Sequence, residues 1–308
     1  NQRMVGTRKN YTTVTGKSSN ISLINLKKAR NVISVIAVVL ILMVSILPLV
    51  SFALESVILK PGDYSPSNFT LQFWIGSAEE NSIANNEAGL LLNPNLWKAL
   101  WNSIKLSIVC ALTAGTLGFL AGYGIVRGRG TKLAKIVDNL AFFPYLMPSM
   151  AFSVIYLSMF STRRGPIPAL YGSFFLLVLI GTVKYMPFAS RSGINSMLQL
   201  SNQIEEAGEI IGVSWPKRMA RLVIPIQKSS FISGYLLPFI SCMRELSLFV
   251  LLVTPQNRVL TTLLFQYNEK GWSQYSNGIN LMIVIIVLLV NFGVNKATGA
   301  SIDKGIGG

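Results

Sequence analysis

Few residues in this 308-residue chain could carry chemistry. It has no histidine, the commonest general base and zinc ligand, and only two cysteines. Cys110 and Cys242 both lie in apolar runs, without the spacing of a metal site or of a disulfide framework. No nucleophile and base form a recognisable set. We therefore expect no catalysis on this chain, no metal site and no cofactor of its own.

One adjacent pair of ionisable residues, Arg244 and Glu245, lies inside a long apolar run. Charges within a membrane span are costly, so they usually face a partner or a water-filled cavity. Neighbours on a helix point about 100° apart and do not form an ideal mutual pair. Two interpretations stay open: these residues line or gate a transport path, or each forms a structural salt bridge with a neighbouring helix. For Lys105 and Lys184, near the ends of their runs, we expect side chains that reach the membrane interface.

The elements that position these residues are apolar blocks. Apolar residues make up 51% of the chain and charged residues 13%, with a mean hydropathy of +0.51. A soluble domain averages about 25% charged residues. A membrane helix needs roughly 20 mostly apolar residues. The sequence therefore predicts an all-α integral membrane protein with about six spans, over residues 32–54, 103–126, 137–160, 169–189, 230–253 and 279–294.

The distribution of positive charge predicts the orientation of these spans. With both termini in the cytoplasm, the cytoplasmic segments hold 18 Lys and Arg and the outside segments hold six. This asymmetry follows the positive-inside rule and accounts for the net charge of +15, so we expect no nucleic-acid partner. Residues 55–98 are the long external loop, with acidic and turn-forming residues and room for a short surface helix.

The third cytoplasmic segment, 191–228, begins with a predicted short helix. Asn202 can cap its start, and Glu205 three residues later completes a capping-box-like pair. Gly212 ends it, because glycine most easily takes the left-handed turn after a helix. One face is apolar at helical spacing and the acids lie off that face. The apolar residues are Ile204, Ala207, Gly208 and Ile211, and the acids are Glu205, Glu206 and Glu209.

A second, basic helix follows. Ser214 can cap its start, Pro216 is tolerated in its first turn, and Pro225 ends it before the next span. Its positive charges are Lys217, Arg218 and Arg221. Two interpretations of this helix pair stay open: a docking element for a soluble partner, or an amphipathic linker lying on anionic lipid.

The same segment resembles the EAA loop of bacterial ABC importer permeases, whose pattern is E-A-A-x3-G-x9-I-x-L-P. The spacing here is kept throughout: Glu206-Ala207-Gly208, three residues, Gly212, nine residues, then Leu222-Val223-Ile224-Pro225. Gly208 replaces the second alanine, Leu222 replaces isoleucine and Ile224 replaces leucine. Gly208 costs up to about 1 kcal/mol of helix propensity, so we expect a looser first helix.

The resemblance implies a type I ABC importer permease in a bacterial cytoplasmic membrane. Its membrane domain would span residues 32–298, between an N-terminal segment 1–31 and a tail 299–308. The coupling residues would be Glu205, Glu206, Ala207, Gly208, Gly212 and Pro225. The implied partners are two cytoplasmic ATPase subunits, a second permease half, an extracytoplasmic substrate-binding protein and membrane lipid. ATP and Mg²⁺ would bind the ATPases, because this chain has no G-x-x-x-x-G-K-[ST] phosphate loop.

Two shorter stretches resemble ferric-iron transporters whose two permease halves are fused. Residues 11–17 resemble their linker, and residues 244–247 resemble a late-helix signature. The chain, which starts at Asn1, is therefore expected to be the second half of such a permease, with iron(III) as the candidate substrate. The alternative is an ion-driven secondary transporter. It should show buried carboxylates and broken helices near the midplane, and only Glu245 offers a deep carboxylate.

Overall fold

In the computed structural model the chain is helical, and no strand occurs in residues 29–81 and 84–299, which are the residues that the structure describes. The expected all-α fold is confirmed. The N-terminal segment 1–31 lies outside the described residues except for its last three, and so does the tail except for Gly299. The linker-like stretch 11–17 therefore lies outside them as well.

The membrane helices lie at the positions that the sequence predicts. Four helices are long and apolar enough to cross a membrane, and one bent pair passes the same test together. The helix α11, with 16 residues, is shorter than these four and lies at the predicted fifth span. The four are α2 (Arg30–Glu55), α4 (Pro94–Arg127), α7 (Phe174–Gln199) and α13 (Ser273–Thr298); the pair is α5 (Lys132–Leu146) with α6 (Ser149–Phe160), and α11 is Lys228–Met243.

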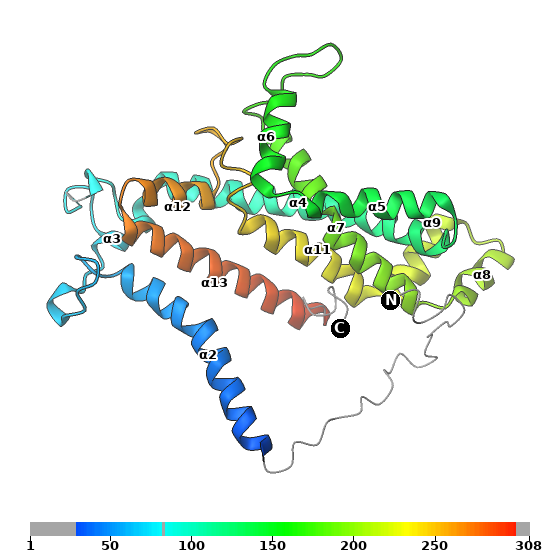
Figure 1. Cartoon of the computed structure of the whole chain (residues 1–308), viewed down its shortest axis with the longest axis horizontal. Helices are drawn as coiled ribbons and strands as arrows, with labels where there is room; N and C mark the ends of the chain where they lie inside the picture. Colours follow the sequence, from blue (N-terminus) through cyan, green and yellow to red (C-terminus); the bar gives the residue numbers. More distant parts are fainter. Residues whose placement is uncertain (1–28, 82–83, 300–308) are drawn as a thin grey trace.

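The third span contains Pro144 and Pro148, which can kink a helix, and it is sharply bent at the second of them. The sequence predicts one span over 137–160, whereas α5 and α6 meet at 104° (Figure 1). Met147 takes an extended conformation, with ψ of 132°, because a residue that precedes proline is pushed out of the helical region. Pro148 then begins the new direction.

The core of the molecule forms where α4, α7 and α11 pack together (Figure 1). Two glycines of α4 allow close approach to α7. A Cβ added to Gly118 would lie 2.5 Å from Ala189 Cβ, and one added to Gly122 would lie 2.7 Å from the Ile194 nitrogen. The G-x-x-x-G pattern thus marks a real backbone contact between two membrane helices. By contrast, α2 packs against α13 and has no buried residue.

Residues 55–81 and 84–98 fold over one end of the bundle. The short helix α3 (Gln72–Ile75) and the 3₁₀ turns η2 (Pro66–Asn68) and η4 (Leu90–Leu92) lie within them. They share an apolar cluster with α13 and with α12 (Leu260–Glu269), a helix the sequence did not predict. Tyr267 of α12 belongs to this cluster, and its hydroxyl donates a hydrogen bond to Glu87 Oε1 at 2.8 Å.

Two membrane helices have different ends from those predicted. The helix α7 continues to Gln199, ten residues beyond the expected Ala189, so Arg191 belongs to the helix. There Arg191 pairs with Asp138 of α5 at 3.1 Å. The helix α11 stops at Met243, although the apolar run continues to Val253. Residues 244–253 form turns instead. An apolar run predicts a buried segment, and it does not by itself predict that the segment is helical.

Candidate functional site

The loop segment between α7 and α11 forms two short helices at one end of the bundle (Figure 1). The first, α8, covers Asn202–Ile210, and the second begins with α9 at Trp215–Arg218. Gly212 between them has a φ of +76°, the left-handed conformation expected after the first helix. The helix pair and its glycine turn therefore agree with the prediction.

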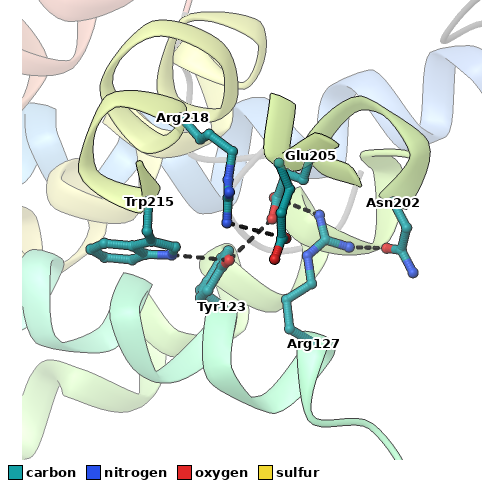
Figure 2. Close-up of polar contacts among 7 residues, drawn as sticks. Tyr123, Arg127, Asn202, Glu205, Trp215 and Arg218 are labelled. Carbon is teal, nitrogen blue, oxygen red and sulfur yellow. Dashed lines mark hydrogen bonds and ion pairs between the residues drawn. The ribbon is translucent and has the colours of Figure 1, made fainter. Parts of the chain in front are cut away.

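The predicted caps differ in detail. Asn202 is the first residue of α8, and Ser201 occupies the N-cap position without a side-chain hydrogen bond. Ser214 occupies the N-cap position of α9, also without one. Asn202 is drawn away because its Oδ1 accepts a hydrogen bond from Arg127 Nη1 (Figure 2). A strong cationic donor on α4 thus competes with the backbone for this side chain.

Pro225 does not end the second helix as predicted. The chain continues from α9 through a π-helical turn, η5 (Met219–Val223), into α10 (Ile224–Ile226), and it breaks only at Gln227. Proline has no N–H, and its ring crowds the carbonyl four residues earlier. The wider π turn directly before Pro225 relieves this crowding, so the helix bends and continues.

Glu205 anchors α8 to the end of α4. Its Oε1 lies 2.6 Å from Arg127 Nη2, and the side chains are only 11% and 18% exposed. Its Oε2 accepts a hydrogen bond from the Tyr123 hydroxyl at 3.0 Å. The Trp215 indole N–H donates in turn to that hydroxyl at 3.0 Å (Figure 2). One buried carboxylate thereby connects α4, α8 and α9.

Arg218 fixes the second helix against the first. Its Nη1 donates to the Val213 carbonyl at 3.0 Å, and its Nη2 lies 3.4 Å from Glu209 Oε2. Gly208 makes room for this side chain, since an added Cβ would lie 3.0 Å from Arg218 Cδ. The glycine that departs from the EAA pattern therefore has a packing role here.

The apolar residues of α8 mostly face outward. Ile204, Ala207 and Ile211 are exposed, Ile210 beside them is 85% exposed, and Glu206 is exposed on the same helix. The buried positions of α8 are instead Glu205 and Gly208. The apolar face that the sequence predicts is therefore mostly exposed, and one of the acids off that face, Glu205, is buried. What remains outside is an apolar surface with a negative charge, which we call the α8 surface (Ile204, Glu206, Ala207, Ile210 and Ile211).

A second feature is a cavity at the bend between α5 and α6. Its volume is about 620 Å³. We call it the bend pocket, and it brings together the α5–α6 junction, α7 and the end of α11. Its lining residues are Tyr145, Met147, Pro148, Ser149, Lys184, Tyr185, Phe188, Ser241, Arg244 and Glu245.

Lys184 holds the bend together. Its ammonium donates to the Met147 carbonyl at 2.5 Å and to the Pro144 carbonyl at 3.2 Å. These carbonyls lack helical partners because the helix breaks there. The expectation that Lys184 reaches the interface from a span end is therefore wrong, because α7 extends well beyond it on both sides. Lys105, for its part, lies 4.4 Å over the Phe174 ring.

Arg244 and Glu245 both line the bend pocket, and both lie beyond the end of α11. The expected helical geometry of the pair is therefore wrong. Glu245 is fixed: its Oε1 accepts from the Leu248 N–H at 3.1 Å and its Oε2 from the Tyr185 hydroxyl at 3.3 Å. Within residues 29–81 and 84–299, neither residue forms a salt bridge. The path or gate interpretation of this pair stays a prediction.

Sequence reasoning missed Lys184, Arg127 and Tyr123 as site residues. One signal could have identified Lys184. Pro144 and Pro148 predict a broken membrane helix, whose freed carbonyls need donors, and Lys184 is a donor in the next predicted span. In the sequence, Arg127 is only one of the 18 positive charges of the predicted cytoplasmic segments. Nothing in the sequence pairs Arg127 with Glu205, since 78 residues separate them.

A family model matches this chain over residues 114–300, and its description is binding-protein-dependent transport system inner membrane component. The chain is 24% identical over 204 residues to the ferric transport system permease protein FbpB of Actinobacillus pleuropneumoniae. That alignment covers 65% of this chain and 29% of FbpB, so the chain spans about a third of the ferric relative. It is 23% identical over 263 residues to PhnV of Salmonella typhi, described as a 2-aminoethylphosphonate transport system permease, covering 85% and 93% of the two chains.

Solved structures share the fold. A chain of a bacterial ABC transporter that imports the acidic polysaccharide alginate superposes with a TM-score of 0.63 at 14% identity, covering 89% of this chain and 99% of that one. A chain of the inward-facing MetNI methionine ABC transporter superposes with a TM-score of 0.56 at 17% identity, covering 66% and 94%.

Proposed function

Because this chain belongs to the family of binding-protein-dependent transport system inner membrane components, matched over residues 114–300, we propose that it couples ATP hydrolysis on a partner to transport through its α8 surface. As a member of that family it is the membrane-spanning permease of an ABC importer. The partner would be a pair of ATPase subunits on the cytoplasmic side. ATP and Mg²⁺ would bind those subunits.

The exposed α8 surface is the observation that carries this proposal. Three exposed isoleucines beside Glu206 would be costly to leave in water, so they suit a site that a partner covers. The Glu205 anchor connects this surface directly to α4. Movement of a docked ATPase would therefore pull on the bundle through a short, mostly buried ion pair.

The proposed orientation follows the charge asymmetry, with both termini and the loop segment on the cytoplasmic side. A second permease half would complete the path, and an extracytoplasmic binding protein would deliver substrate on the opposite face, where residues 55–81 and 84–98 fold over the bundle. Iron(III) is the candidate substrate by likeness to FbpB. The likeness to PhnV, over 93% of its length, supports a phosphonate as a second candidate.

The test is ATPase activity and substrate uptake of the reconstituted complex with Glu206→Lys. Charge reversal at a docking surface places an unfavourable charge against the partner. We expect uptake to fall at least about tenfold while the chain still inserts and pairs. Glu269→Lys is the matched control, since Glu269 is an exposed acid on α12 at the other end of the bundle. Unchanged assembly, hydrolysis and uptake in Glu206→Lys would refute the docking contact.

A further inference from the structure

The bend pocket carries an excess of positive charge. Two cations, Lys184 and Arg244, line it with a single carboxylate, Glu245. Both oxygens of that carboxylate already accept hydrogen bonds, from Leu248 and Tyr185. Its main-chain carbonyl also accepts one, from the Thr261 hydroxyl at 2.7 Å. Glu245 is therefore held in the wall and cannot turn toward a ligand without breaking these bonds.

Arg244 is the group left without a partner. The residue is exposed and lines the pocket, and its side chain forms no hydrogen bond, ion pair or ring contact with any residue in the described part of the chain. A guanidinium offers five donors in a planar fork that matches carboxylate and phosphate oxygens. Lys184 spends two of its three N–H bonds on main-chain carbonyls and retains one.

We propose that the bend pocket binds an anion: a small solute bearing a carboxylate, phosphate or phosphonate group, with Arg244 as its principal contact and Lys184 as the second cation. This inference rests on the proposed transport function, because it names the class of solute that the path accepts. The volume of about 620 Å³ lies within the usual range of sites for small molecules.

The same charges exclude a bare metal cation as the species bound there. No group of three or more His, Cys, Asp or Glu that could hold a metal occurs among the described residues. Two cations against one carboxylate would repel an unchelated ferric ion. If iron is the cargo, it passes this pocket as a negatively charged chelate, in which organic acid groups face Arg244.

The test measures the electrostatic potential inside the pocket of the full-length chain in phosphatidylcholine nanodiscs. Ser241→Cys supplies a reporter thiol in the pocket wall, with Cys110→Ala and Cys242→Ala removing the native thiols. Rates of labelling are compared for two methanethiosulfonates, one with a negative sulfonate and one with a positive trimethylammonium. Ser149→Cys, at the start of α6 and also in the pocket lining, is the second reporter if Ser241→Cys does not fold.

We expect the sulfonate to react faster than the ammonium reagent, after correction for their rates with a free thiol. Lys184→Gln and Arg244→Gln should each lower this ratio by about five- to tenfold, because removing one unit charge changes the two rates in opposite directions. Lys105→Gln is the matched control, a membrane lysine that does not line the pocket, and should leave the ratio unchanged. A ratio insensitive to both pocket variants would overturn the proposal.

Occupancy is tested by protection of the same thiol. Citrate and methylphosphonate should slow labelling by both reagents, and spermidine should not. Protection by spermidine alone would overturn the proposal. Protection by added phosphatidylglycerol, without protection by the soluble anions, would assign the pocket to a lipid headgroup and overturn its role for a solute.

This experiment is independent of ATPase coupling. Glu206→Lys should lower uptake at least about tenfold and leave the labelling ratio unchanged, since Glu206 lies on α8 and does not line the bend pocket. If coupling fails its own test while the labelling ratio still depends on Arg244, the anion site stands and the coupling proposal falls. If instead Glu206→Lys lowers uptake while the labelling ratio does not depend on Arg244 or Lys184, the anion site is refuted and the coupling proposal stands.

Discussion

The Glu205–Arg127 ion pair should decide whether α8 stays attached to the membrane bundle, and Glu205→Gln tests this. The substitution keeps the size of the side chain and an acceptor for Tyr123, while it removes the charge that faces Arg127. Breaking a buried ion pair by removing one partner costs about 3–5 kcal/mol. The 11% and 18% exposure of these side chains reduces that figure, and we expect about 2–4 kcal/mol.

The loss should be local. The bundle of α4, α7 and α11 does not depend on Glu205, whereas α8 has Glu205 and Gly208 as its buried residues. A loss of about 2–4 kcal/mol corresponds to an increase of about 30- to 1,000-fold in the population of detached α8, if detachment leaves the bundle folded. Hydrogen exchange of the α8 amides, measured by mass spectrometry in nanodiscs, should accelerate by this factor.

Glu209→Gln is the matched control for this measurement. It makes the same chemical change on the same helix, but Glu209 is 71% exposed and its contact with Arg218 is 3.4 Å. Exposed ion pairs contribute about 0–1 kcal/mol, so exchange should change less than about fivefold. If Glu205→Gln and Glu209→Gln gave the same α8 exchange, the Glu205 anchor would be wrong.

Three further predictions concern stability. Gly118→Ala places a Cβ 2.5 Å from Ala189 Cβ and should cost about 1–3 kcal/mol of unfolding free energy, seen as a lower melting temperature in detergent; an unchanged melting temperature would refute the close contact. Gly212→Ala forces a φ of +76° on a residue with a Cβ and should accelerate α8 exchange by about fivefold, from a cost of about 1 kcal/mol; equal exchange would refute it. Burial and the Glu87 carboxylate raise the pKa of Tyr267 above its usual 10.0, so the neutral phenol is favoured in the folded state and stability should fall as the pH rises above about 10. Tyr267→Phe should remove that part of the alkaline loss in a pH series of melting temperatures.

The sequence predicts the membrane helices well because each depends on a local property, a run of apolar residues long enough to span lipid. The glycine turn at Gly212 is likewise local, since only glycine takes a positive φ without strain. The bend at Pro148 is the intermediate case. Proline predicts a kink, but it does not predict the angle of 104°. The bend is also held by a hydrogen bond from Lys184, which belongs to another helix.

The site is predicted less well because its contacts are long-range. Periodicity identifies an apolar face on α8, and it does not reveal that this face is the exposed one. The direction is set by Arg127 and Tyr123 of α4, which bind Glu205 and turn the opposite side of the helix inward. Likewise, the apolar run after Met243 predicts a longer α11, whereas the turns there present Arg244 and Glu245 to the bend pocket.

The Lys184 contacts at the bend also constrain how this chain can change by mutation. Two carbonyls there depend on one ammonium from a helix 37 residues away, and a residue that cannot donate would leave them unpaired in a medium of low polarity. Position 184 should therefore be epistatic with position 148. In a combinatorial library of the two positions, one class of functional clones should keep proline at position 148 and a hydrogen-bond donor at position 184. The other class should have an apolar residue at position 184 and, at position 148, a residue that restores a continuous helix.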